Sequence, residues 1–197
     1  MIHGAMQSYA LTLDKFIDHA AKWHPGVEVV TAGEFGAASR IGYAALRRRA
    51  LRISAVLAGR GVNKGDCVAT LAWNTQAHVE AWFAIMGIGA VCHTLNPRLT
   101  AASLANMLRQ SEARILIASA DLAAFAQQIL KCAESEAIIL TIDDPSGGAQ
   151  SLATDARIGA LEAELESAGG DDVVWGAFGE SAPSGLCFTS GTTGAPK

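Results

Sequence analysis

Four short apolar segments recur along the chain at nearly equal intervals. They begin near Cys67, Val91, Arg114 and Ala137, about 23 residues apart, which is the reach of one strand plus one crossover helix. Three of them, CVATLA, RILIA and AIILTI, are apolar at consecutive positions instead of alternating. Strands of a parallel sheet show this pattern because helices cover both of their faces. The sequence therefore predicts an α/β fold: a layered, mostly parallel sheet with crossover helices.

Amphipathic segments between these runs supply the predicted crossover helices. In the first of them Trp82, Phe83 and Met86 recur at helical spacing, and Asn74 or Thr75 is the expected N-cap. We expect this stripe of large side chains to pack in the core. Thr100 is the expected cap of the second helix, and the third covers residues 122–130.

The two ends of the chain lack the regular alternation of apolar strand and crossover helix that its middle shows. Residues 13–20 carry one helical face, and Pro25 ends that helix. A hairpin over 31–39 leads into a second helix that begins near Tyr43. Towards the other end, we expect a surface loop over 143–155, a helix over 156–165 and a last short buried strand over 185–189.

Composition excludes several classes of protein. The chain of 197 residues is 50% hydrophobic and 17% charged, which is too apolar for a disordered protein. Its net charge of −4 lacks the basic footprint of a nucleic-acid binder. The four cysteines form no CxxC pair and the five histidines no metal motif, so neither a zinc site nor a disulfide scaffold is predicted. A reducing cytoplasm fits this cysteine usage best.

Membrane signals are also missing from the sequence. The first ten residues do not have the basic flank and apolar run of a signal peptide. The longest apolar run, over 81–92, is shorter than the roughly 20 residues that a bilayer-spanning helix needs. We expect a soluble cytoplasmic protein, and the sequence leaves peripheral membrane contact and homodimer formation open.

The stretch from Thr189 to Lys197 carries the clearest chemistry. It places four hydroxyl side chains around Gly191 and Gly194 and then adds a lysine. Glycines permit close approach of the backbone, consecutive N–H groups bind anions, and a hydroxyl reaches the Mg²⁺ that accompanies a nucleotide. A strand directly before this stretch would bring it to a sheet edge, where α/β folds bind ligands. The residue types therefore favour a polyphosphate-binding loop.

Other interpretations of glycine-rich segments are weaker. A Walker A loop needs G-x-x-x-x-G-K-[ST], but here Gly191 and Gly194 are too close and Lys197 does not follow a glycine. A dinucleotide fingerprint needs G-x-G-x-x-G, and the candidate at Gly87 and Gly89 lacks the third glycine. From the residues alone, a flexible Ser/Thr/Gly linker remains the alternative.

Several motifs together point to one family. Residues 188–197, FTSGTTGAPK, resemble the phosphate-loop signature of the adenylate-forming (AMP-binding) superfamily, which contains acyl-CoA synthetases, luciferases and peptide-synthetase adenylation domains. IGYAAL at 41–46, GVNKGDCVA at 61–69, and GIGAV at 87–91 followed by Asn96 and Pro97 resemble further family motifs in the family's order. The resemblance spans nearly the whole chain and is weak over 143–180.

The resemblance implies a two-step reaction and a set of site residues. A carboxylate attacks the α-phosphate of Mg·ATP to give an acyl-adenylate, and the thiol of coenzyme A then displaces AMP. In that scheme the loop 189–197 holds the β- and γ-phosphates, Thr189 also contacts Mg²⁺, and Lys197 contributes charge. The implied ATP contacts are Thr189, Ser190, Gly191, Thr192, Thr193, Gly194 and Lys197. No catalytic residue is assigned.

The resemblance also implies what kind of piece this chain is. Residues 1–197 correspond to a partial N-terminal (AMP-binding) domain, the N-terminal part of the acyl-CoA synthetase large domain. VCHTLNPRL at 91–99 and GLCF at 185–188 are similar to bacterial medium- and long-chain fatty-acyl-CoA synthetases. We expect the chain alone to form no thioester. The alternatives are a non-catalytic nucleotide-binding or assembly module, and a ligase for aryl or amino acids.

Four further features are expected to be structural. For Trp82, Phe83 and Met86 core packing is expected, and the alternative is that they line an acyl tunnel together with Trp73. The arginines at 47–49 and Arg52 are expected to form a solvated helical face, with a phosphate- or CoA-binding patch as the alternative. His93 is expected to be a partly buried structural histidine after a strand, with a catalytic role as the alternative. Cys187 is expected to lie on a buried strand as a small hydrophobic residue.

Overall fold

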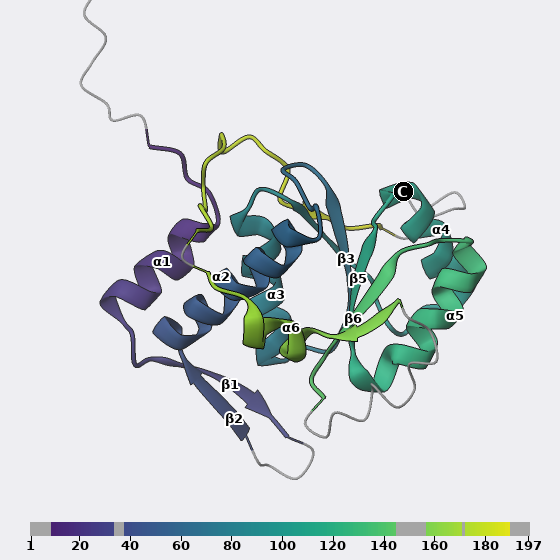
Figure 1. The fold of residues 1–197 in the computed structure, drawn as a ribbon, viewed down its shortest axis with the longest axis horizontal. Coiled ribbons are helices and arrows are strands. Elements are labelled where there is room, and N and C mark those ends of the chain that lie inside the picture. Colours follow the sequence, from purple (N-terminus) through teal and green to yellow (C-terminus); the bar gives the residue numbers. More distant parts are fainter. Residues whose placement is uncertain (1–8, 34–37, 145–156, 171, 190–197) are drawn as a thin grey trace, which may run out of the picture.

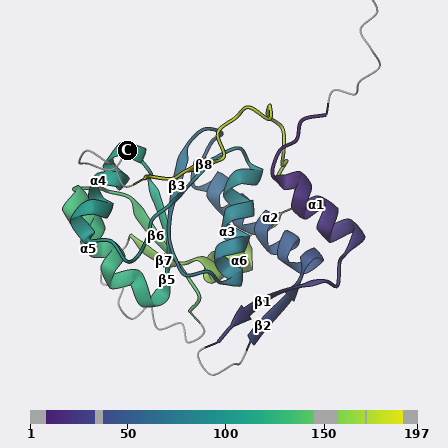
Figure 2. The ribbon, with the colours of Figure 1, turned by 180° about the vertical axis from the view of Figure 1, so that it is seen from behind.

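The computed structural model describes residues 9–33, 38–144, 157–170 and 172–189. Within these ranges, one parallel sheet of six strands forms the centre of the molecule, in the order β7-β6-β5-β3-β4-β8 (Figures 1 and 2). Its strands are Cys67–Leu71 (β3), Val91–Thr94 (β4), Ile115–Ser119 (β5), Ile138–Ile142 (β6), Ile158–Ala160 (β7) and Gly185–Leu186 (β8). The predicted α/β class with a mostly parallel sheet is confirmed.

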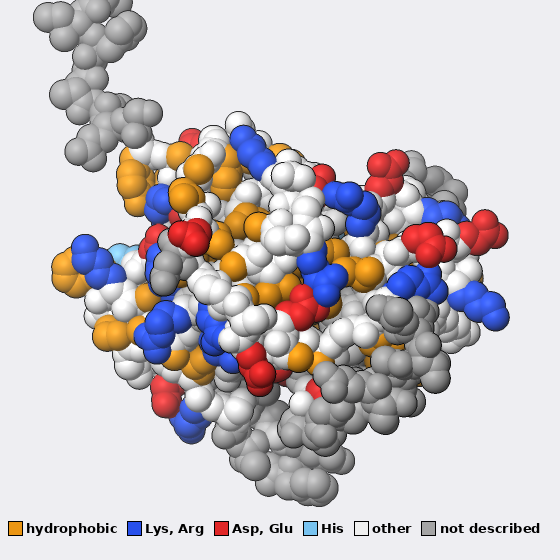
Figure 3. All heavy atoms as spheres, in the orientation of Figure 1, with side chains coloured by type: hydrophobic (Ala, Val, Ile, Leu, Met, Phe, Trp, Pro, Cys, Tyr) orange, Lys and Arg blue, Asp and Glu red, His pale blue; other side chains and the backbone are white. Residues whose placement is uncertain are grey.

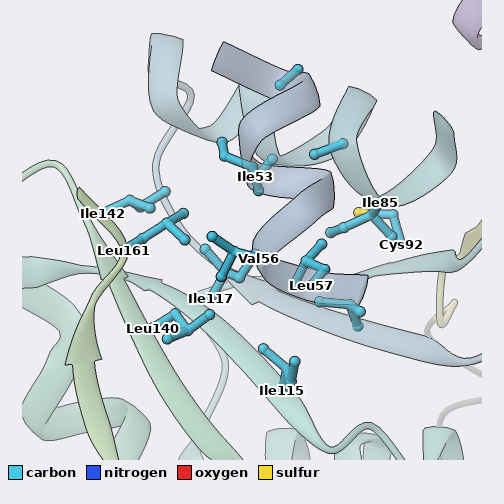
Figure 4. Packing of buried hydrophobic residues seen from close by; sticks show 14 of the residues in the cluster. Ile53, Val56, Leu57, Ile85, Cys92, Ile115, Ile117, Leu140, Ile142 and Leu161 are labelled. Carbon is cyan, nitrogen blue, oxygen red and sulfur yellow. The ribbon is translucent and has the colours of Figure 1, made fainter. Parts of the chain in front are cut away.

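Helices cover both faces of this sheet (Figure 1). The helices are Asp14–Trp23 (α1), Tyr43–Gly59 (α2), Gln76–Gly87 (α3), Ala101–Ser111 (α4), Ala123–Ala133 (α5) and Leu161–Ser167 (α6), with a short 3-10 turn at Ala120–Leu122 (η1). One buried cluster joins α2, α3 and α6 to one face, and a second joins α4 and α5 to the other. Figure 4 shows the first cluster, in which Ile53 and Leu57 of α2 meet Ile117 of β5 and Leu140 of β6.

Side chains along a single strand point alternately to the two faces of the sheet, so one strand contributes to both clusters. In β5, Ile115 and Ile117 belong to the α2 side, whereas Leu116 and Ala118 belong to the α4 side. Every residue of this strand is buried, as the consecutive apolar run predicts. The central strands therefore carry apolar side chains at most positions on both faces.

Capping residues set where two crossover helices begin. The side-chain oxygen of Thr75 accepts the backbone N–H of His78 at the start of α3. Thr100 accepts the N–H of Ser103 at the start of α4. Both predicted caps are confirmed, and each satisfies a backbone donor that the first helical turn leaves unpaired.

The N-terminal elements pack outside the sheet. Strands Glu28–Ala32 (β1) and Ala38–Gly42 (β2) pair antiparallel and form the predicted hairpin, which leads directly into α2. Helix α1 ends before Pro25, as expected, and packs against α2. Figure 3 shows exposed hydrophobic side chains around α1, where Tyr9, Leu11, Phe16 and Trp23 are each at least 60% exposed.

The structure corrects the predictions for 156–165 and 185–189. Ile158–Ala160 is not helical but pairs parallel with β6, Ile139 standing opposite Ile158, and the helix begins only at Leu161. A sheet partner distant in sequence therefore overrides the local helical pattern. The last strand is also shorter than predicted, since β8 covers only Gly185–Leu186. Of the predicted loop 143–155, all but the first two residues lie outside the described residues.

Candidate functional site

Strand β8 determines where the glycine-rich loop starts. It pairs parallel with β4, with Cys92 opposite Gly185 and His93 opposite Leu186. The N–H of Cys92 donates to the carbonyl of Ser184 over 2.9 Å. Among the described strands β8 is the last at this side of the sheet, and its carboxyl end points the same way as that of β4. Thr189 follows as an exposed residue.

The structure therefore brings the start of the predicted phosphate loop to the carboxyl edge of a parallel sheet, which is where α/β folds bind ligands. Thr189 is the one candidate site residue within the described part of the chain. The others lie outside it: Ser190, Gly191, Thr192, Thr193, Gly194 and Lys197.

A polar network occupies the same edge of the sheet between β3 and β5. The N–H of Trp73 donates to Ser119 Oγ over 3.2 Å, and its indole Nε1–H donates to Asp121 over 2.9 Å. Thr75 Oγ1 donates to Asp143 Oδ2 over 2.7 Å. Strands β4 and β5 lie on opposite sides of β3, so this is the point where the strand order reverses. Sequence analysis missed the network, although polar residues directly after the apolar runs were a usable signal.

His78 is buried and fully hydrogen-bonded on the α3 side of this edge. Trp82 Nε1–H donates to its Nε2 over 3.0 Å, and Nδ1 lies 3.0 Å from the carbonyl of Trp73. An indole nitrogen can only donate, so Nε2 must be the acceptor and Nδ1 must carry the proton. Burial lowers the pKa of His78, which favours this neutral form. The residue therefore fixes the start of α3.

His93 on β4 contrasts with His78. It is 0% exposed, and neither Nδ1 nor Nε2 has a hydrogen-bond partner among the described residues. Its ring lies 5.2 Å from the ring of Phe188, centroid to centroid. Burial alone lowers its pKa from 6.5 to about 4, so the imidazole is neutral at pH 7. The residue is more deeply buried than predicted and lies within the strand instead of after it.

An apolar groove of about 580 Å³ lies between α1, α3 and β8. Trp82, Phe83 and Met86 line it from α3, and Leu186 and Cys187 line it from β8 and the residue beyond. The expected core packing of this α3 stripe is therefore wrong for Trp82, which is 42% exposed. The prediction for Cys187 is also wrong, because this residue is exposed. Helix α3 is apolar on several sides, so its sequence does not select which side faces the core.

Two arginines of α2 form hydrogen bonds and ion pairs within the protein, unlike the residues of a solvated helical face. Arg49 Nε donates to both oxygens of the wholly buried Glu80 over 2.9 Å and also pairs with Glu162 on α6. Arg52 donates to the carbonyls of Leu165 and Ala168, also at α6. The prediction of a solvated face is wrong for these two residues because α6 packs across them.

Neither a metal cluster nor a membrane-spanning helix is found in the described part of the chain. No group of three or more His, Cys, Asp or Glu residues in it is arranged to hold an ion. No described helix is long and apolar enough to cross a bilayer.

Comparison with known proteins identifies the family. The family model described as "AMP-binding enzyme" matches residues 17–197. The chain belongs to the AMP-binding enzyme family. A 3-methylmercaptopropionyl-CoA ligase of Ruegeria lacuscaerulensis is 34% identical over 200 residues, covering 98% of this chain and 35% of the relative. A medium-chain-fatty-acid–CoA ligase of Ectopseudomonas oleovorans is 31% identical over 195 residues, with the same coverage.

Solved structures of a CoA ligase and of an acyl CoA synthetase share this fold. The anthranilate CoA ligase AuaEII, in complex with anthranoyl-AMP, superposes with a TM-score of 0.81 at 17% identity, over 95% of this chain and 34% of the ligase. A Mycobacterium tuberculosis fatty acyl CoA synthetase gives 0.75 at 22% identity, over 94% of this chain and 33% of the synthetase. The chain is similar to the N-terminal part of these proteins, as the resemblance implied. It spans about a third of their length.

Proposed function

We propose that this chain supplies the triphosphate-binding loop, and the sheet that carries it, to an ATP-dependent acid–thiol ligase. The ligase activates a fatty acid through an acyl-adenylate and transfers the acyl group to coenzyme A. The supporting observation is that the loop signature FTSGTTGAPK begins two residues after β8, whose carboxyl end lies at the carboxyl edge of the sheet. Residues 1–197 then form the first part of the large domain, in a cytoplasmic enzyme.

The roles of the loop residues follow from their chemistry. Backbone N–H groups around Gly191 and Gly194 bind the β- and γ-phosphates, and the hydroxyls of Ser190, Thr192 and Thr193 add donors. Lys197 contributes a positive charge to the same anion. Thr189 is exposed and lies three residues after the edge strand, and its hydroxyl is the group that we assign to the Mg²⁺ that accompanies ATP. These groups stabilise charge and hold the triphosphate in place, which is what phosphoryl chemistry of this kind needs.

Direct binding tests the first part of this proposal. The 197-residue chain should bind inorganic tripolyphosphate in the presence of Mg²⁺, measured by isothermal titration calorimetry. Ser190→Ala and Thr192→Val should each weaken binding by about tenfold, the value of one charge-assisted hydrogen bond. Ser181→Ala, an exposed hydroxyl outside the loop, is the matched control and should bind normally. Equal affinity in all four proteins would contradict the assignment of the loop.

Substrate class is tested on the whole protein that contains this chain. ATP–pyrophosphate exchange is measured with octanoate, palmitate, benzoate and an amino acid as the carboxylate. We expect exchange with the fatty acids, in line with the names of the relatives from Ectopseudomonas oleovorans and Thermus thermophilus, which are medium- and long-chain-fatty-acid–CoA ligases. Exchange with benzoate or the amino acid alone would replace the fatty-acid assignment with an aryl- or amino-acid ligase.

A further inference from the structure

Helix α1 turns two large aromatic side chains towards solvent. Ile17 is buried on the inner side of the helix, whereas Phe16 and Trp23 on the outer side are 67% and 63% exposed. These two residues lie two helical turns apart, so they fall on one line along the helix. Exposed apolar side chains that gather on one face mark an interaction surface.

The two sides of this helix face differ in their chemistry. On one side, Lys22 lines a groove of about 450 Å³ between α1 and α2, together with Arg47 and Arg48 of α2. On the other side, Phe16 lines the apolar groove that α1 shares with α3 and β8. Figure 3 shows hydrophobic side chains next to those of Lys and Arg over α1 and α2. The surface is therefore basic along one flank and apolar along the other.

Positive charge is in excess in the groove between α1 and α2. Arg47 is neutralised by Asp18, which accepts from its Nε over 2.6 Å. Lys22 and Arg48 form no ion pair within the described part of the chain. The Nζ of Lys22 lies 5.0 Å from the ring centroid of Trp23. A chain with a net charge of −4 thus presents unpaired cations directly beside an exposed aromatic ring.

We propose that this face of α1, with the basic groove beside it, docks onto an anionic lipid bilayer. Phe16 and Trp23 insert at the level of the headgroups, and Lys22 and Arg48 bind lipid phosphates. Aromatic rings favour the interface between membrane and water, and cations near it are attracted to anionic lipids. A second copy of this chain fits less well, because a two-fold contact sets the same cations against each other.

Sedimentation with lipid vesicles tests this proposal on the 197-residue chain. The chain should bind vesicles of phosphatidylcholine mixed with phosphatidylglycerol, and should bind phosphatidylcholine alone much more weakly. Raised salt should weaken the binding because it screens the charges. Lys22→Gln and Arg48→Gln should each weaken binding to mixed vesicles about fivefold, the value of one basic side chain near an anionic surface. Phe16→Ser and Trp23→Ser should each weaken it about tenfold, because each removes an inserted ring.

Two matched controls lie outside this surface. Lys131→Gln removes an exposed lysine of α5, and Leu99→Ser removes an exposed apolar side chain before α4. Both controls should bind the mixed vesicles as the wild type does. The melting temperatures of all six variants should stay close to that of the wild type, since substitutions of exposed side chains change stability little.

The other possible occupants of this surface give different results. Absence of binding to the mixed vesicles would overturn the proposal, and so would wild-type binding by Lys22→Gln and Trp23→Ser. A dimer that forms without lipid and is lost in Trp23→Ser would assign the surface to a second copy instead. Displacement from the vesicles by inorganic phosphate at matched ionic strength would show that the cations bind free phosphate and not a headgroup. No nucleotide enters these measurements, so their failure leaves the proposed function standing.

Discussion

The indole ring of Trp175 lies against the Cα atom of Gly87, so close that a Cβ at position 87 would lie 2.5 Å from the ring. The indole Nε1–H donates to Ser54 Oγ over 2.9 Å, and the N–H of Gly176 donates to the carbonyl of Gly87 over 3.0 Å. These contacts attach the segment before β8 to α2 and α3. The strand that begins the loop is thereby tied to the helical layer.

Gly87→Ala should destabilise the protein because Trp175 cannot move without losing its hydrogen bond. We expect a loss of about 1–3 kcal/mol in the free energy of unfolding, the usual cost of overpacking. Gly59→Ala is the matched control: Gly59 also ends a helix, but nothing lies within 4 Å of its added Cβ. The control should be neutral or more stable by up to about 1 kcal/mol. Urea unfolding followed by tryptophan fluorescence measures both, and equal stability of the two variants would contradict the Trp175 contact.

Arg49→Met should destabilise the fold through Glu80. The Glu80 side chain is wholly buried and, among the described residues, would keep the amide of Gln76 as its one remaining partner. We expect a loss of about 3 kcal/mol at pH 8, typical for a buried pair that loses one member. Burial already raises the pKa of Glu80, and removal of the cation raises it further, so the loss should be smaller at pH 5.

Arg48→Met is the control for this measurement, because Arg48 lies on the same helix and is exposed. It should change the free energy of unfolding by less than about 0.5 kcal/mol. A similar loss in both variants would show that the charge of α2, and not the pairing with Glu80, is what matters.

The stability of the protein should depend on pH through His93. Burial lowers its folded-state pKa from 6.5 to about 4, so the unfolded chain takes up a proton at higher pH than the folded chain does. Stability therefore falls as the pH drops from about 6.5 towards 4, by about 3 kcal/mol for this wholly buried group. The lowered pKa of His78 acts in the same direction. The raised pKa of Glu80 opposes both.

Comparison of variants isolates the contribution of His93. His93→Leu should lose less stability than the wild type between pH 7 and pH 5. Contributions of His78 and Glu80 are common to both proteins and cancel in the difference. Parallel curves for His93→Leu and the wild type would contradict the burial of a neutral imidazole at this position.

The four free thiols should react at clearly different rates with a disulfide reagent at pH 8. Cys132 and Cys187 are exposed and should react first. Cys92 is buried in β4, and burial raises its pKa to about 12, so it should react only when the strand opens. Cys67 is half-buried, its pKa raised by burial and by Asp66, and should be intermediate. All four should react at once in denaturant, and rapid labelling of Cys92 without denaturant would contradict the position of β4.

Much of the fold could be predicted from local sequence patterns. The apolar runs located the central strands to within one residue of their observed starts, because a strand buried on both faces is apolar at most consecutive positions. Thr75 and Thr100 were recognisable as caps because a helix start needs an acceptor within one turn. The loop composition at 189–197 indicated a polyphosphate site for a similarly local reason, since the anion-binding groups are adjacent in the chain.

Tertiary structure decided what depends on partners distant in sequence. Ile158–Ala160 forms a strand because it pairs with the edge of β6. Arg49 became half-buried because Glu80 and α6 reach it from other parts of the chain. The place of β8 beside β4, and with it the contact of His93 with Phe188, follows from pairing across about ninety residues. The hydrophobic pattern that specifies a helix or a strand lies in neighbouring residues, so the sequence shows it directly. Which strands pair with each other depends on the packing of the whole chain.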